Sequence, residues 1–168
     1  MAKFTPYLLL ALILLGASCA TPRVAEPKIG QPVTLKFTAV DGRKVDLAQL
    51  RGKVVLLYFC ASWCPPCVRE VPQIKATYEK LYPKGFEIIG ISLDAHTRTR
   101  FDDYTKANKI PWPQHIEKWN GPLMKQFNVR SIPAEILIDQ EGRIAHLNAR
   151  QNLEQKVGSL LQPSAHTK

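Results

Sequence analysis

Residues 53–72 read KVVLLYFCASWCPPCVREVP, and this stretch decides the fold expected of the chain. Its first eight residues, 53–60, form a continuous apolar, β-rich run that is typical of a strand covered on both faces. Helix-spaced apolar residues over 65–82 predict a helix directly after that strand. Three of the four cysteines of the chain fall in the stretch. Cysteines placed so closely are structural staples, metal ligands or working thiols.

Cys64 stands where the predicted strand gives way to the predicted helix, and Cys67 follows three residues later. On a helix these positions are neighbours on one face, within the separation that a disulfide needs. A thiol at a helix N-terminus is stabilised as thiolate by the helix dipole and by unpaired amides, so Cys64 is predicted to be a nucleophile. Pro65 and Pro66 suit the first helical turn but have no N–H. The Cys67 amide is then the first donor to the Cys64 sulfur, and we expect a mild activation of Cys64.

The rest of the chain alternates predicted strands and helices. Residues 34–40 and 43–47 alternate apolar and polar side chains around Asp41-Gly42, which predicts a hairpin. The later elements are a buried strand over 86–94, a helix over 97–109, a short helix over 122–127, a hairpin of 134–139 with 143–148, and a closing helix over 152–161. With 168 residues and 45% hydrophobic composition, the chain suits one domain. The order of elements predicts the α/β class, with a mixed central sheet flanked by helices.

The first 18 residues have the form of a secretory signal, with a basic start, an apolar run too short to span a membrane, and small residues before Cys19. A cysteine in this place resembles the lipid-attachment site of a bacterial lipoprotein, so Cys19 is the predicted lipid anchor. Cleavage nearby without lipid and an uncleaved anchor are the alternatives. Residues 19–32 are expected to be a tether, 33–162 the folded domain and 163–168 a disordered tail. The predicted location is the periplasmic side of the cell envelope, with the lipid holding the chain to a membrane.

The chain is basic, with a formal net charge of +9 at pH 7. A basic exterior of this size suits anionic headgroups or an acidic partner. Because the basic residues are scattered and form no run, a solvated surface is the preferred interpretation. We expect no nucleic-acid partner for an exported chain.

A combination of motifs connects the chain with a known family. The motif WCPPC (63–67) after an apolar strand is followed by E-x-P (70–72) and, far downstream, by SIPAEILIDQEGRI (131–144). Together they resemble the extracytoplasmic, membrane-tethered branch of the thioredoxin-like family, the TlpA/ResA type, over about residues 33–162. The resemblance implies a thioredoxin fold with an N-terminal hairpin extension, and a cis peptide bond at Ile132-Pro133 beside the two cysteines.

The same resemblance implies a thiol-disulfide exchange mechanism. Cys64 attacks a disulfide in a partner protein, and Cys67 resolves the mixed disulfide, which makes Cys64–Cys67 the redox-active disulfide. Backbone groups around Pro133 hold the extended chain of the partner in strand fashion. The other predicted substrate-binding residues are Trp63, Pro65, Pro66 and Ile132; ordinary packing is the alternative role of Trp63.

The predicted substrates are protein disulfides, which the chain reduces outside the cytoplasm as a monomer. An oxidant or isomerase of the same fold is the alternative. The sequence carries no Gly-rich nucleotide fingerprint. We therefore expect no cofactor, and electrons from another thiol protein that is embedded in the membrane.

Cys67 needs a proton acceptor. Cytosolic thioredoxins keep a buried acid six residues before the first cysteine, and Tyr58 occupies that place here. Glu70 follows Cys67 by one helical turn and matches a glutamate usual in this branch, with a solvated helix residue as the alternative. Glu135 lies in an apolar strand on the same face as Leu137, so its carboxylate should be desolvated with a raised pKa suited to proton transfer.

Cys60 precedes Cys64 by four residues on the predicted strand, where relatives commonly have Trp. It is interpreted as a small core residue. The alternative is a third redox thiol that traps or resolves an oxidised Cys64, since an unpaired cysteine is unusual in an exported protein.

Other classes of function fit less well. A structural zinc site needs four ligands, and the histidines show no ligand spacing, so no metal is expected. A permanent disulfide between residues three apart closes almost no loop and would stabilise little. A thiol peroxidase lacks its usual P-x-x-x-T-x-x-C signature here. A metal-binding or partner-docking lipoprotein with incidental thiols is the alternative outside enzymes.

Overall fold

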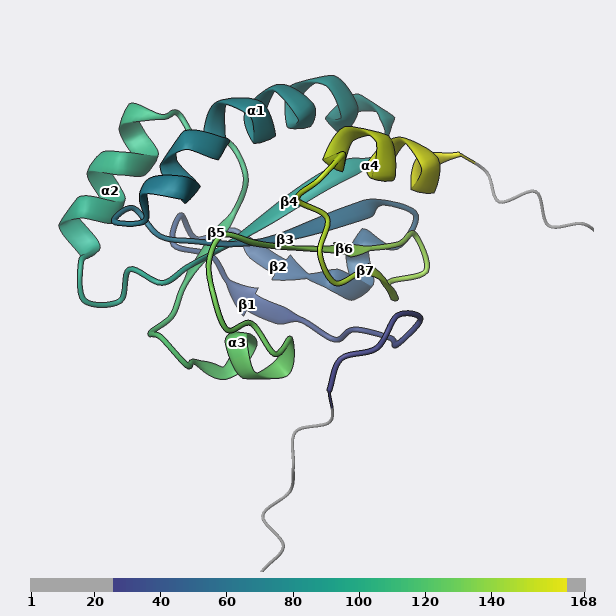
Figure 1. The fold of residues 1–168 in the computed structure, drawn as a ribbon, viewed down its shortest axis with the longest axis horizontal. Helices are drawn as coiled ribbons and strands as arrows, with labels where there is room; N and C mark the ends of the chain where they lie inside the picture. Colours follow the sequence, from purple (N-terminus) through teal and green to yellow (C-terminus); the bar gives the residue numbers. More distant parts are fainter. Residues whose placement is uncertain (1–25, 163–168) are drawn as a thin grey trace, which may run out of the picture.

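The computed structural model describes residues 26–162, and Figure 1 shows how their elements are arranged. The predicted signal over 1–18, the predicted anchor Cys19 and the predicted tail over 163–168 lie outside the described residues, as does the first half of the predicted tether, residues 19–25. Within 26–162, no helix is long and apolar enough to cross a membrane.

The fold is built on two parallel strands that are hidden from solvent. β3 (Val54–Cys60) pairs with β4 (Phe86–Ser92) along its whole length. All seven residues of β3 are buried, and β4 is buried except at Glu87. Because other layers cover both faces of these strands, their sequences are apolar without interruption. Both predicted buried strands are thus confirmed.

β3 and β4 form the centre of a five-stranded mixed sheet in the order β5-β4-β3-β6-β7. β5 (Gln114–Ile116) runs parallel to β4, β6 (Ala134–Ile138) antiparallel to β3, and β7 (Ile144–His146) antiparallel to β6. The predicted hairpin near the C-terminus is β6 with β7. The sequence does not predict β5, because three residues with a polar start show no strand period.

Helices cover both faces of this sheet. α1 (Pro65–Leu81) and α4 (Leu153–Leu161) lie side by side over one face, with α2 (Arg98–Ala107) on the same side (Figure 1). α3 (Pro122–Gln126) lies on the opposite side (Figure 1). Two short 3-10 turns precede β3 and β4, namely η1 (Leu47–Leu50) and η2 (Tyr82–Lys84). The predicted helices agree with the observed ones to within two residues at each end.

α1 follows β3 after a short loop and carries the two cysteines at its N-terminus. Pro65 and Pro66 occupy its first two positions, where a fixed φ suits a helix and a missing N–H costs nothing. The helix continues through Pro72. The residues it buries toward the sheet recur every three or four positions and include Cys67, Val71, Ile74, Tyr78 and Leu81.

The predicted N-terminal hairpin is a separate two-stranded sheet of β1 (Lys36–Thr38) and β2 (Lys44–Asp46). Its turn contains Asp41 and Gly42, as predicted. Gly42 adopts a φ of 85°, a left-handed conformation that favours glycine.

The N-terminal segment also pairs with both outer edges of the main sheet. Beside β7, Gly30 N donates to the Ile144 carbonyl at 2.7 Å, and Ile144 N donates to the Gln31 carbonyl at 2.9 Å. At the other edge, Val40 N donates to the carbonyl of Gln114 in β5 at 2.9 Å. Residues 30–40 therefore reach from one edge of the sheet to the other.

Because β3 is completely buried, we expect its side chains to contribute strongly to the free energy of unfolding. Leu57 of β3 is fully buried, whereas Val68 on α1 is 37% exposed. We expect Leu57→Ala to lower the free energy of unfolding by about 2–5 kcal/mol, because it removes buried carbon and leaves a cavity. The control Val68→Ala should cost less than about 1 kcal/mol. Urea unfolding measures both variants, and equal midpoints for the two would contradict this core.

Candidate active site

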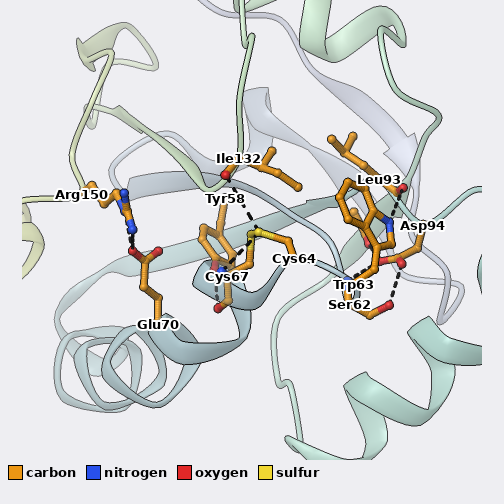
Figure 2. Close-up of a disulfide and its surroundings, with 11 residues drawn as sticks. Tyr58, Ser62, Trp63, Cys64, Cys67, Glu70, Leu93, Asp94, Ile132 and Arg150 are labelled. Atoms are coloured by element: carbon orange, nitrogen blue, oxygen red, sulfur yellow. Dashed lines mark hydrogen bonds and ion pairs between the residues drawn. A yellow bond between two sulfur atoms is a disulfide. The ribbon is translucent and has the colours of Figure 1, made fainter.

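Cys64 and Cys67 are joined by a disulfide where β3 gives way to α1 (Figure 2). Cys64 is the N-cap residue of α1, with extended backbone angles, and its Cα atom lies 5.3 Å from that of Cys67. Cys67 is fully buried, and Cys64 is 5% exposed. The spacing of the motif thus brings the two sulfurs together, with Cys64 as the more accessible one.

Among the described residues, a single main-chain amide contacts the Cys64 sulfur. Cys67 N donates to it at 3.4 Å. Pro65 and Pro66 fill the positions between and have no N–H to offer. A thiolate at Cys64 would therefore gain one amide hydrogen bond, which is the geometry behind the mild activation expected from the sequence.

The segment before β6 faces the cysteines. The Ile132-Pro133 peptide bond is cis, as the resemblance implies. The Ile132 carbonyl oxygen lies 3.9 Å from the Cys64 sulfur. A groove of about 530 Å³ opens beside Pro133, lined by residues 127–131 and 133–136 and by Leu147, Asn148 and Arg150. A chain laid along Pro133 would contact both this groove and Cys64.

Trp63 stands at the rim of the site. This residue is 40% exposed, and its Nε1 donates to the Leu93 carbonyl at 3.4 Å. An indole held by one polar contact keeps an apolar face open to solvent. This position suits the predicted contact with a substrate.

Asp94, two residues after β4, is fully buried, and sequence reasoning misses it. Its carboxylate accepts hydrogen bonds from Ser62 N at 2.9 Å, Ser62 Oγ at 2.7 Å, Ser92 Oγ at 2.5 Å and Thr97 Oγ1 at 2.7 Å. These bonds tie the loop before Cys64 to the end of β4 (Figure 2). An acid placed directly after an apolar strand is the sequence feature that could have revealed it.

Tyr58 and Glu135 lie beneath the first turn of α1. The Tyr58 hydroxyl donates to the Cys67 carbonyl at 3.3 Å, and burial raises the pKa of this phenol. Glu135 is the partner of Tyr58 in the β3–β6 pair, so their side chains share one face of the sheet. Glu135 is 3% exposed. Burial, helped by the charge of Glu70, raises the pKa of Glu135 to about 7.

Glu70 is not a freely solvated helix residue. Its Oε1 accepts a hydrogen bond from Nε of Arg150 and forms an ion pair with Nη2 of the same residue, which comes from the segment between β7 and α4 (Figure 2). The hydrogen bond to Glu70 in turn raises the pKa of Arg150. Sequence reasoning misses Arg150, because it lies 80 residues from its partner in an irregular segment. The disulfide thus lies between two polar clusters, Glu70 with Arg150 on one side and Ser62 with Asp94 on the other (Figure 2).

Cys60 is buried at the end of β3 and is not part of a disulfide. Burial, with the charge of Asp94, raises the pKa of its thiol. Because a thiol held protonated is a weak nucleophile, the structure favours the core interpretation over a third redox thiol. Within residues 26–162, no group of three or more His, Cys, Asp or Glu side chains could hold a metal ion.

A helix that opens on one accessible and one buried cysteine, facing a cis-proline segment at the end of a mixed sheet, defines a thioredoxin-like thiol-disulfide oxidoreductase. Comparison with known families gives the particular lineage. Residues 29–147 match the AhpC/TSA family, and the chain belongs to it.

Named relatives carry out the same class of chemistry. The chain is 34% identical over 119 residues to the thiol-disulfide oxidoreductase ResA of Bacillus thuringiensis subsp. konkukian, which covers 70% of this chain and 68% of that protein. It is 27% identical over 138 residues to the sporulation thiol-disulfide oxidoreductase A of Bacillus subtilis, covering 79% and 82% of the two chains. The crystal structure of the thioredoxin domain of a thiol-disulfide oxidoreductase from Bacteroides vulgatus matches with a TM-score of 0.67 at 25% identity, over 82% of this chain and 99% of that one. The resemblance to the TlpA/ResA type, the thioredoxin fold and the enzyme class are confirmed.

The Pro-Pro pair predicts how Cys64 titrates. Pro66→Ala restores the amide at the second helical position, and we expect it to lower the pKa of Cys64 by about one to two pH units, because a hydrogen bond to a charged group contributes roughly 1.5–3 kcal/mol. Ultraviolet absorbance of the thiolate in the reduced protein measures this. Pro72→Ala is the control, since it adds an amide far from the sulfur. Identical titrations for wild type and Pro66→Ala would contradict the role given to the missing amides.

Glu135 predicts a pH-dependent stability. Because burial raises its pKa from 4.5 to about 7, the unfolded chain loses this proton at a lower pH than the folded chain. As pH rises through this window the folded state holds more protons, so the free energy of unfolding falls, by up to about 3 kcal/mol. Glu135→Gln cannot ionise, and we expect it to gain stability relative to wild type as pH rises.

Urea unfolding of wild type and Glu135→Gln at a series of pH values measures this difference. Glu141→Gln, at an exposed position, is the control. A constant difference between wild type and Glu135→Gln across the window would contradict the burial of an ionisable carboxyl at this position.

Proposed function

We propose that this protein reduces protein disulfides outside the cytoplasm, with Cys64 and Cys67 as its redox couple. The direction is inferred from one observation, the single amide that contacts the Cys64 sulfur. A disulfide couple is oxidising when its reduced form is stabilised, as in oxidants with a strongly acidic first thiol. Since Pro65 and Pro66 withhold their donors, the reduced form gains little here. The oxidised form is then favoured, which is the property of a reductant.

The proposed cycle balances as an exchange of two electrons. The Cys64 thiolate attacks one sulfur of a client disulfide, forms a bond to it, and releases the other client sulfur as a thiolate. Cys67 then loses its proton and attacks the Cys64 sulfur, which expels the remaining client sulfur. The client takes up two protons, one equivalent to the proton that Cys67 lost and one from solvent, and leaves as a dithiol, and the Cys64–Cys67 disulfide of the structure is formed. A second thiol protein returns two electrons to this disulfide.

We assign Glu135 as the group that accepts the proton lost by Cys67. Its pKa of about 7 lets the carboxyl accept a proton and release it again near neutral pH. It lies opposite Tyr58, whose hydroxyl contacts the Cys67 carbonyl. Glu70 is held by Arg150, and its assigned role is to set the electrostatic environment of Glu135.

The client chain is assigned to the surface beside the disulfide. Ile132 and Pro133 offer backbone to an extended chain next to the Cys64 sulfur. The exposed indole of Trp63 offers an apolar contact on the other side. Pro65 and Pro66 complete this surface at the helix terminus. Because they have no N–H, they offer no donor that would compete with the client backbone.

The location rests on the sequence of the N-terminal residues. The signal-like residues 1–18 and the cysteine at position 19 support export and a lipid anchor on Cys19, at the periplasmic side of the cell envelope. An anchored monomer could receive electrons from a thiol protein embedded in the same membrane. Of the predicted tether over 19–32, the residues before Gly30 would give the domain the reach to meet both that donor and its clients, because Gly30 and Gln31 are bonded to β7.

The reduction potential of the Cys64–Cys67 couple tests the direction. We expect about −250 mV or below, in the region of thioredoxin, when the protein is equilibrated with glutathione and dithiothreitol buffers. A value near −120 to −180 mV would identify an oxidant or isomerase and overturn the proposal. Cys60→Ser is the control and should leave the potential unchanged, because Cys60 lies in the core.

A further inference from the structure

Two carboxylates line one small cavity between α1 and β6. Glu70 from α1 and Glu135 from β6 both line a space of about 30 Å³, room for a single water molecule, together with Arg150. Each acid keeps one buried oxygen, Oε2, that has no hydrogen-bond partner among residues 26–162. Two acids that face one small space cannot both carry a full negative charge without cost.

Arg150 contacts one of the two acids and makes no hydrogen bond to the other. Its Nε and Nη2 both contact Oε1 of Glu70. Glu135 receives no hydrogen bond from Arg150 or from any other described side chain, although it lines the same cavity. A guanidinium that compensates one carboxylate and leaves the other unbonded makes the pair unequal.

The backbone holds Arg150 in this place. Ala149 N donates to the carbonyl of Glu135 at 2.9 Å. Lys156 from α4 donates to the Asn148 carbonyl at 3.0 Å, and Arg150 N donates to Asn148 Oδ1 at 3.3 Å. The segment that carries Arg150 is therefore bonded to β6, the strand of Glu135, while the Arg150 side chain forms an ion pair with Glu70.

We infer that Arg150 is a positioning residue: by holding Glu70 as its ion-pair partner, it keeps the negative charge of this cavity on Glu70 and leaves the exchangeable proton on Glu135. The inference rests on the proposed function for its purpose, the transfer of the Cys67 proton. No contact joins Arg150 to either sulfur among residues 26–162, although Arg150 also lines the groove beside Pro133. Its effect on the exchangeable proton is exerted through the two carboxylates.

The charged groups around Glu135 give the sign of each effect. Glu70 raises the pKa of Glu135, whereas Arg150 and Lys156 lower it. Tyr58 from β3 is a buried phenol with a raised pKa. From β7, His146 stands opposite Leu137, and burial lowers its pKa. Removing Arg150 should therefore raise the pKa of Glu135, and removing the charge of Glu70 should lower it.

Carbon-13 titration of the glutamate carboxyls in the oxidised, full-length protein tests this, because the disulfide leaves Cys64 and Cys67 without a proton. We expect Arg150→Ala to raise the Glu135 midpoint by about one pH unit, and Glu70→Gln to lower it by a similar amount. Arg150→Lys keeps the charge and should restore the midpoint. Arg98→Ala, which removes a surface ion pair with Asp102, is the matched control and should leave the midpoint unchanged.

A merely structural role for Arg150 predicts the opposite result. If Arg150 only held the segment in place, its loss would admit water and move the Glu135 midpoint down, toward the ordinary value of a glutamate. A downward or absent shift in Arg150→Ala overturns the inference. Arg150 is an exposed residue, so the variant should fold, and Arg150→Lys separates charge from packing in any case.

Turnover separates the inference from the proposed function. With the midpoint raised by one pH unit, disulfide reduction by Arg150→Ala at pH 7 should fall roughly fivefold, and the acid limb of its pH profile should move up by the same amount. Suppose that Arg150→Ala and Glu70→Gln move the Glu135 midpoint in opposite directions, but Glu135→Gln turns over as fast as wild type. The positioning role of Arg150 is then supported, and Glu135 is not the proton acceptor. If Glu135→Gln turns over slowly but the Glu135 midpoint does not shift in the other two variants, the positioning role of Arg150 is overturned and Glu135 is supported as the proton acceptor.

Discussion

Burial of β3 on both faces fixes the position of the two cysteines and of Tyr58. A strand whose two faces are both packed cannot change its register without moving all of its side chains to the wrong layer. β3 therefore ends at one place, and α1 has to begin a few residues later with Cys64 at its N-terminus. The same register puts Tyr58 beneath the Cys67 carbonyl and opposite Glu135. The chemistry of the site is in this sense a property of the sheet.

Two buried acids near the disulfide show how hydrogen bonding decides what a carboxylate does. Asp94 is fully buried and accepts four hydrogen bonds from nearby backbone and hydroxyl groups. Such bonds compensate the loss of water, so Asp94 serves to hold the loop before Cys64. Glu135 is nearly as buried but receives no side-chain partner, and its pKa rises to about 7. The same functional group is thus architectural in one place and able to exchange a proton in the other.

The sequence predicts those features that depend on local pattern. The long apolar runs, the turn at Asp41-Gly42 and the helix after Cys64 all have periods or residue types that one sequence reveals. Glu135 could also be found, because a charged residue in an apolar strand breaks the pattern. β5 could not, since its three residues form a strand only because β4 and the N-terminal segment pair with it. Arg150 could not be predicted either, because its partner Glu70 lies 80 residues away and no local pattern indicates that contact.

The N-terminal segment pairs with part of each outer edge of the sheet. An open sheet edge presents unpaired amides and carbonyls, which is how folded proteins come to aggregate or exchange strands. Residues 30–31 bond to the outer side of β7, and Val40 bonds to the outer side of β5. Both ends of the hydrogen-bonding direction are thereby occupied by the protein's own backbone. On the proposed function, a client chain held in extended form beside Pro133 would meet outer strands that are already partly paired, which disfavours its addition to the sheet.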